Sequence, residues 1–241
     1  VIIKPNVYSW RGITVKNIFE TSYNYKRDLD SHMMKNTEWG SVAFLSHSKY
    51  GTNKEINLNN NSSFKTGYSA LPTTSQQTYP GTSGDGPTYN SAYNTNIGYL
   101  ASTSGNISGV YDISGGSWEY LASYITGKLG SSGFSTTTLA NYDSKYFDTY
   151  NAASTLTTYQ YRILGDATGE MGPFKQYLDG DNTSRYHSSW YGDVSYFVDS
   201  SNSWFLRGGP YTDGVLSGSF YFYGYSGGTH ISGSFRIILT P

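Results

Sequence analysis

Four histidines are the residues of this chain best suited to bind a transition metal: His32, His47, His187 and His230. Metal-binding histidines that act together locally stand two or four positions apart, as in HxH or HExxH. The four histidines show neither spacing, so we expect ordinary core or surface roles and no metal site. A zinc or iron site assembled from distant segments is the alternative.

The segment LDGDNTSRYHSSW begins like a calcium-binding loop, because Asp179, Asp181 and Thr183 place oxygen ligands at alternate positions. It lacks the later glycine and the bidentate glutamate that complete such a loop. We therefore interpret it as a turn rich in Asp and Asn. Calcium binding is the alternative.

A pair of carboxylates could hydrolyse a glycosidic bond, and four acidic residues are candidates: Asp112, Glu119, Asp166 and Glu170. Each stands near a glycine or at an expected helix start, where turn and capping roles are common. The glycines build no phosphate-binding loop either, since GGSWEYL lacks the lysine of such loops. We expect no catalytic residue, no cofactor and no enzymatic activity.

The composition is typical of short strands joined by many loops. The chain has 241 residues, of which 37% are hydrophobic and 14% charged, and it contains 25 Tyr and 28 Gly. A chain of this length suits a single domain, here residues 1–241.

Charge and hydropathy argue against several partners. The formal net charge is −1 and the lysines and arginines are scattered, so no basic face is available for nucleic acid or anionic lipid. No run of about 18 apolar residues is present for membrane insertion, and any signal or anchor is expected outside this chain. The lack of cysteine rules out disulfides and thiolate metal sites.

The segment KNTEWGSVAFLSHSKYG predicts the first helix. Asn36 or Thr37 can cap it, and Gly51 can close its end. Four residues share one face at helical spacing: Trp39, Val42, Ala43 and Ser46. Residues 51–104, which are rich in Asn, Ser, Thr, Gly and Tyr, are expected to form a long loop packed on the core by its tyrosines; disorder is the alternative.

The segment GNISGVYDISGGSWEYLASYI predicts a strand, a turn and a helix. Val110, Tyr111 and Ile113 indicate a short strand, and Gly115 with Gly116 a turn. A second helix is expected next, with a helical face made of Trp118, Leu121, Ala122 and Ile125. Apolar surroundings place four tryptophans in the core: Trp39, Trp118, Trp190 and Trp204.

The C-terminal segments SGSFYFYG and SFRIILTP alternate as strands do. From Ser217 to Tyr223, alternation predicts that Phe220 and Phe222 face the core. Ser219, Tyr221 and Tyr223 are then expected to point outward together. Tyr, Ser and Gly are also the residues that binding loops favour, because they combine rigid contact area with adaptability. This strand is therefore predicted to be a binding face.

Five residue types are missing from the window Gly208–Phe235. Lys, Glu, Gln, Met and Trp make up 27 of the 241 residues, so a 28-residue window is expected to hold about three, and this one holds none. These are the five residues that no codon of the form NNC encodes. A segment diversified at the first two bases of such codons has this composition.

The motifs GVYDISGGSWEYLAS and WFLRGG…SGSF…GSFRIIL resemble signatures of the formylglycine-generating-enzyme-like C-type lectin fold. The likeness spans about residues 33–239. HMMKNTEWGSVAFLSHSKYG, LGDATGE and SSWYGDVSYF further resemble the variable proteins of diversity-generating retroelements, of the type found in phages and gut Firmicutes. The chain departs from the pattern at Gly115 to Ser117, and it lacks the copper-binding cysteines of the oxidase branch.

The resemblance implies a single α+β domain with a twisted antiparallel sheet, two main helices and extensive ordered loops. It implies a non-enzymatic adhesin-like protein, at a cell or virion surface or extracellular, that binds a protein or cell-surface ligand. A calcium-dependent carbohydrate-binding lectin and a metal-dependent enzyme of the same superfamily are the alternatives.

The resemblance also assigns roles to residues. A hypervariable-type segment is expected over about residues 207–237, held by scaffold residues Trp118, Arg207, Gly208, Gly209, Phe235 and Arg236. The expected ligand-binding residues are Pro210, Tyr211, Val215, Leu216, Ser219, Tyr221, Tyr223, Tyr225, Ser226, Thr229, His230 and Ile231.

Overall fold

The computed structural model of the protein describes residues 6–70, 92–151, 175–176, 186–188, 190–196 and 198–240. Its helices are α1 (Val15–Asn24), α2 (Asn36–Ser46) and the short α3 (Thr136–Leu139). Its 3-10 helices are η1 (Arg27–Leu29), η2 (Gly98–Ala101), η3 (Ser144–Tyr146), η6 (Trp190–Gly192) and η7 (Gly214–Leu216). Its strands are β1 (His32–Met33), β2 (Trp118–Ile125), β3 (Asp148–Tyr150), β4 (Lys175–Gln176), β5 (Tyr186–Ser188), β6 (Val194–Tyr196), β7 (Trp204–Arg207), β8 (Phe222–Tyr225), β9 (Gly233–Phe235) and β10 (Ile237–Ile238).

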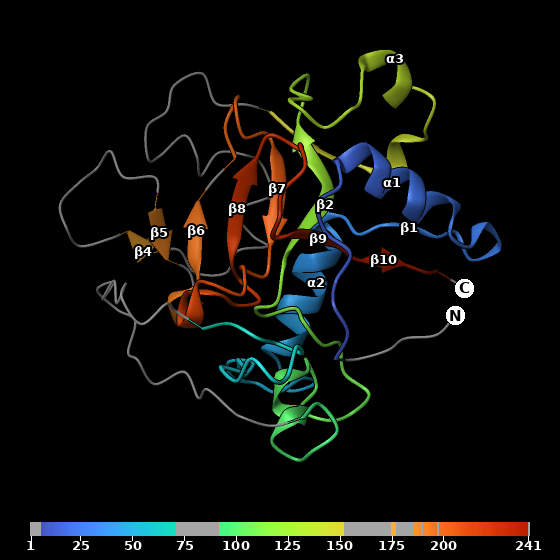
Figure 1. The fold of residues 1–241 in the computed structure, drawn as a ribbon. Helices are drawn as coiled ribbons and strands as arrows, with labels where there is room; N and C mark the ends of the chain where they lie inside the picture. Colours follow the sequence, from blue (N-terminus) through green and yellow to red (C-terminus); the bar gives the residue numbers. More distant parts are fainter. Residues whose placement is uncertain are drawn as a thin grey trace.

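The main sheet has the strand order β3-β2-β7-β8-β6-β5-β4, and β9 pairs with the beginning of β2 (Figure 1). β7 runs antiparallel to both β2 and β8, whereas β3 and β9 run parallel to β2, and β6 parallel to β8. β1 pairs with β10 in a separate small sheet. The α+β class is confirmed, but the sheet is mixed rather than antiparallel throughout.

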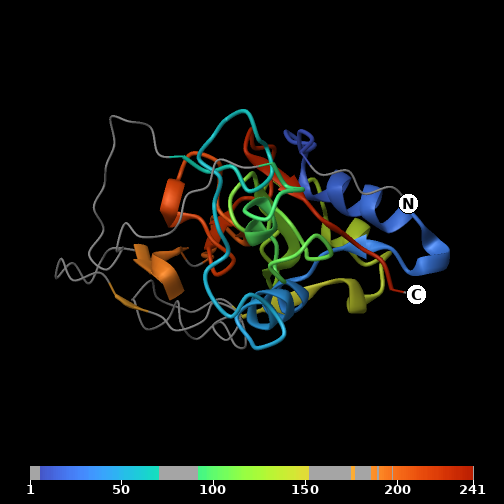
Figure 2. The same ribbon diagram turned by 90° about the horizontal axis from the view of Figure 1, so that it is seen from below.

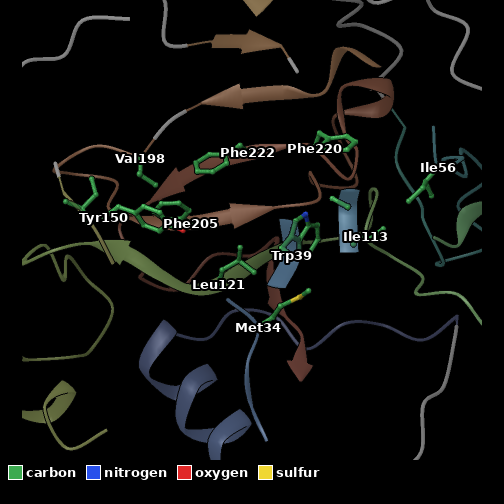
Figure 3. Packing of buried hydrophobic residues seen from close by; sticks show 12 residues of the cluster. Met34, Trp39, Ile56, Ile113, Leu121, Tyr150, Val198, Phe205, Phe220 and Phe222 are labelled. Atoms are coloured by element: carbon green, nitrogen blue, oxygen red, sulfur yellow. The ribbon is translucent and has the colours of Figure 1, made fainter. Parts of the chain in front are cut away.

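The two main helices lie on opposite sides of β2 (Figure 2). On one side, Val15, Ile18 and Phe19 of α1 share a buried cluster with Tyr120 and Ala122 of β2. On the other side, α2 packs on the opposite face of the same strand (Figure 3). There the cluster includes Trp39, Ala43, Leu121, Phe205 and Phe222. Each helix therefore buries one face against the sheet, although α2 also keeps Phe44 and Leu45 exposed.

The helix predicted within residues 35–51 is confirmed as α2, but Lys35 and not Asn36 or Thr37 occupies the N-cap position. The helix ends at Ser46 with His47 as its C-cap, so Gly51 does not close it. The predicted helix over residues 118–125 is wrong, because this segment is the central strand β2. Seven of its eight residues are buried, on both faces of the sheet. A strand that is buried on both faces does not alternate between polar and apolar residues. Its apolar residues can therefore fall at the spacing that is typical of a helix. The second main helix is instead α1, which we did not predict.

Residues 110–113 form no strand in the structure, contrary to our prediction. Asp112 has a positive φ of 59°, a value that breaks an extended segment. The turn predicted at Gly115 and Gly116 is confirmed, since both have φ near 76°, where glycine is favoured. The described parts of residues 51–104 are mostly loop, as expected, and buried Ile56 joins their packing to the α2 cluster.

Two tryptophans are fully buried, Trp39 and Trp204, and two are only partly buried, Trp118 and Trp190. The core prediction is therefore confirmed for the first pair, while the second pair lies at the margin of the core. No helix in the described part of the chain is long and apolar enough to cross a membrane.

Candidate functional site

The strand predicted from residue 217 begins only at Phe222, in β8. Within β8 the expected alternation holds: Phe222 is buried in the α2 cluster, while Tyr223 and Tyr225 are half-buried on the α1 face. Residues 218–220 form a turn, closed by a hydrogen bond from N of Tyr221 to O of Gly218 (3.0 Å). Alternation is a property of extended backbone, so it cannot be extrapolated through this turn.

Four residues that we expected on the surface are buried: Pro210, Leu216, Ser219 and Tyr221. Tyr221 is the clearest correction, since it is 1% exposed and its hydroxyl donates to Oδ2 of Asp213 (3.2 Å). Burial raises the pKa of this phenol. Tyr221 therefore belongs to the support of the segment and not to its displayed side chains, and the same holds for the other three.

The backbone of residues 219–221 is held from the core side of the sheet. O of Ser219 accepts from Nε1 of Trp39 (2.8 Å) and from Nη2 of Arg207 (3.5 Å). Nε of Arg207 also donates to O of Tyr221 (2.7 Å), and its Nη1 donates to Oδ1 of Asn36 (2.7 Å). Arg207 thus acts as the scaffold residue we predicted, and it fixes the start of β8.

Asp193, which directly precedes β6, holds the same turn. Its Oδ2 accepts from N of Phe220 (2.9 Å), and its burial raises its pKa well above the ordinary value. A Cβ on Gly218 would lie 2.1 Å from this carboxylate, so only glycine fits there. The turn that precedes the strand is therefore rigid in both its backbone and its packing.

Five half-buried rings form one connected row, which we call the aromatic row: Tyr196, Tyr223, Trp118, His230 and Tyr225. Tyr223 stacks on Tyr196 (4.7 Å between centroids) and on Trp118 (5.2 Å). His230 contacts Trp118 (4.7 Å) and Tyr225 (5.0 Å). The row therefore combines three strands, β2, β6 and β8, with the loop that precedes β9.

The aromatic row lies on the α1 face of the sheet, but α1 covers β2 and does not reach β8 or β6 (Figure 1). The rings consequently keep one edge in solvent. Exposed Thr229 and Ile231 flank His230, and Ile231 is 77% exposed. Rigid, partly solvated rings surrounded by small polar residues are typical of binding surfaces.

Eight of the twelve predicted ligand-binding residues reach the surface in the structure: Tyr211, Val215, Tyr223, Tyr225, Ser226, Thr229, His230 and Ile231. Trp118 and Tyr196 join the row although we did not predict them as site residues. The alternation of VSY in β6, where Val194 is buried and Tyr196 is not, is a signal that could have found Tyr196. No comparable pattern pointed to Trp118, because the apolar spacing of its segment is that of a helix.

Two of the candidate catalytic carboxylates have structural partners. Glu119 accepts from Arg236 at both oxygens (2.6 and 3.0 Å), and Arg236 also donates to O of Tyr111 (3.0 Å). Asp112 accepts from N of Gly67 (2.5 Å). Asp112 thus has the turn role we predicted, whereas Glu119 neither caps a helix nor lies in a turn, because it belongs to β2 and pairs with Arg236. Asp166 and Glu170 lie outside the described residues, as do the calcium candidates Asp179, Asp181 and Thr183.

The described histidines have separate surroundings. The ring of His47 is hydrogen-bonded to the hydroxyl of Tyr191, and the ring of His32 in β1 is hydrogen-bonded to Glu38 in the first turn of α2. Nδ1 of His230 accepts from N of Ser232 (3.0 Å), and burial lowers the pKa of this ring. The side chain of His187 lies outside the described residues. Among the residues that are described, no three His, Cys, Asp or Glu side chains gather closely enough to hold a metal ion.

His32 makes the stability of the domain depend on pH. Its Nε2 bonds Oε1 of Glu38 (2.9 Å) and its Nδ1 bonds O of Asp30 (2.7 Å), so both ring nitrogens face acceptors. The bond to Glu38 is the main cause that raises the pKa of His32. A raised folded-state pKa stabilises the protein below the unfolded value of about 6.5, and this stabilisation is lost as the pH rises through the folded-state pKa.

We therefore expect urea unfolding to give a lower free energy of unfolding at pH 8.5 than at pH 6. The variant His32→Gln should lose roughly 1.5 kcal/mol at pH 6, the value of a hydrogen bond to a charged group, and less at pH 8.5. An identical pH dependence in the variant would show that His32 is not the titrating group.

No protein-family model matches this sequence, and a search among curated proteins finds no match either.

Proposed function

We propose that this chain is a non-enzymatic binding protein that presents the aromatic row and its exposed neighbours to a protein or cell-surface ligand. The observation that carries the proposal is the row itself: five rings in mutual contact, each partly solvated, on a sheet. Large rigid rings lose little entropy on binding, and a few of them supply most of the affinity in a typical interface.

The support beneath the row fits this role. The hydrogen bonds that hold the backbone of residues 219–221 come from Arg207, Trp39 and Asp193, and the displayed ring of Tyr223 stacks on the buried ring of Tyr221 (6.2 Å between centroids). Displayed side chains can then change while the strand stays in place. A segment with diversified side chains requires a backbone that is held in this way. The lack of Lys, Glu, Gln, Met and Trp in Gly208–Phe235 is a second observation that supports a diversified segment.

The assignment of this chain to a fold family and to a class of binding protein rests on its sequence motifs. We propose the C-type lectin-like fold of formylglycine-generating-enzyme type and a variable protein of a diversity-generating retroelement. Such a protein acts at a cell or virion surface or outside the cell. A reverse-transcriptase gene and a template repeat beside the coding sequence are the expected genomic counterparts.

The test measures binding of the labelled protein to a panel of bacterial cells by flow cytometry. We expect saturable binding to at least one member of the panel. The triple variant Tyr223→Ala, Tyr225→Ala and His230→Ala should weaken it at least tenfold, which corresponds to about 1.4 kcal/mol. Thermal unfolding of the variant serves to show that the fold is retained.

The matched control removes an exposed ring elsewhere: Tyr50→Ala, where the side chain is 76% exposed beyond the end of α2. It should bind as the unaltered protein does. Equal binding by the triple variant would contradict the proposal. Loss of binding in the presence of a calcium chelator, with the fold intact, would instead favour the calcium-dependent lectin.

A further inference from the structure

A pocket of about 300 Å³ opens beside the candidate binding segment and shares only Tyr211 with it. One wall is the N-terminal segment 7–11, the second is the loop over residues 62–68, and the floor includes Gly116 and Ser117. A pocket of this volume accommodates one small molecule.

Among the described residues, two cations line the pocket, Arg11 and Lys65, and no carboxylate does. The guanidinium carbon of Arg11 lies 5.8 Å from the ring centroid of Tyr211, and Nζ of Lys65 lies 4.5 Å from that of Tyr8. Within the described part of the chain, neither cation forms an ion pair with an acidic side chain. The pocket therefore carries positive charge that an anionic ligand could neutralise.

One carboxylate lies behind the pocket wall. A Cβ on Gly116 would come within 3.8 Å of Oδ1 of Asp112. The same oxygen already accepts a hydrogen bond from N of Gly67 (2.5 Å), and Arg236 adds a favourable charge to the Asp112 carboxylate. Burial raises the pKa of Asp112, and this residue is not among the described residues that line the pocket.

The rest of the lining suits a ring that carries hydroxyl groups. Three serine hydroxyls can each donate and accept a hydrogen bond: Ser9, Ser62 and Ser117. Three tyrosines offer ring faces for the apolar side of a ligand: Tyr8, Tyr68 and Tyr211. A bare inorganic anion would use only the cations and leave these groups without a contact.

The N-terminal wall is fixed at both ends. N of Asn6 donates to Oγ1 of Thr66 (3.0 Å), and Oδ1 of Asn6 accepts from N of Lys65 (2.6 Å). At the other end, N of Gly12 donates to O of His230 (3.2 Å). These hydrogen bonds hold the segment that carries Arg11 against the loop that carries Lys65. The two cations therefore line the same pocket.

We propose that this pocket binds a small anionic sugar, namely a polyhydroxylated ring with one carboxylate or phosphate group. The cations bind the anionic group, and the serines and tyrosines contact the ring. The site does not depend on the function proposed for the aromatic row, because none of the five rings of the row lines the pocket.

The experiment is a calorimetric titration of the protein at low salt with four probes: glucuronate, glucose 6-phosphate, glucose and inorganic phosphate. The first two distinguish a carboxylate from a phosphate as the anionic group. We expect at least one of them to bind at least tenfold more tightly than both glucose and inorganic phosphate. The variants Arg11→Gln and Lys65→Gln should each weaken that binding at least tenfold.

The matched control is Lys49→Gln, because Nζ of Lys49 also lies over a tyrosine ring, that of Tyr50 at 5.0 Å, but outside the pocket. It should leave the affinity unchanged. Equal affinities for glucose and the two anionic sugars, no binding of either anionic sugar, or an equal loss in Lys49→Gln would each overturn the proposal. Since the probes are isolated small molecules, such a failure leaves the cell-binding test of the aromatic row unaffected.

Discussion

Replacing Arg207 by alanine is expected to lower the free energy of unfolding by about 3 to 5 kcal/mol, a large share of the roughly 5 to 15 kcal/mol of a typical domain. The side chain is 0% exposed and donates to the carbonyl of Tyr221 and to the side chain of Asn36. The buried acceptors lose this donor, and the missing side chain leaves a cavity. Urea unfolding followed by circular dichroism measures the change.

The conservative variant Arg207→Lys separates charge from geometry. Lysine keeps the positive charge but cannot make the forked contacts of a guanidinium, so we expect most of the loss to remain. Exposed Arg11 provides the control, and Arg11→Ala should stay within about 0.5 kcal/mol of the unaltered protein. A normal unfolding midpoint for Arg207→Ala would show that this arginine is not the anchor of β8.

Replacing Trp39 by alanine is also expected to remove about 3 to 5 kcal/mol of stability. The ring is fully buried in the α2 cluster and touches the backbone of Gly208, where a Cβ would lie 3.2 Å from it. Its Nε1 donates to O of Ser219. The variant loses both the packing between α2 and the sheet and one bond that holds the turn before β8.

Two further variants divide these contributions. Trp39→Phe keeps most of the ring but removes the donor, so it should cost clearly less than the alanine variant, about 1 to 3 kcal/mol. Trp10 is a tryptophan at the surface that meets Phe235 edge to face, and Trp10→Ala should cost about 1 kcal/mol or less. Equal losses for Trp10→Ala and Trp39→Ala would contradict the assigned core.

Features that depend on neighbours along the chain could be predicted from the amino-acid sequence alone. The apolar spacing of residues 36–46 gives α2, and the paired glycines Gly115 and Gly116 give a turn that only positive φ allows. Alternation within β8 correctly placed Phe222 inside and Tyr223 and Tyr225 toward the surface. Local periodicity and backbone sterics carry this information, so no tertiary structure is needed to read it.

Contacts between residues that are distant in the sequence could not be predicted in this way, because they depend on the fold. Tyr221 is buried because a turn interrupts the alternation just before β8, and this turn is held by Arg207 of β7 and by Asp193, which directly precedes β6. Trp118 and Tyr196 enter the aromatic row because β2, β6 and β8 bring them together in space. A central strand that is buried on both faces does not alternate between polar and apolar residues, so its pattern does not identify it as a strand. Contacts between distant segments cannot be predicted from the spacing of residues within one segment. For these residues the fold, and not the local sequence, sets their place.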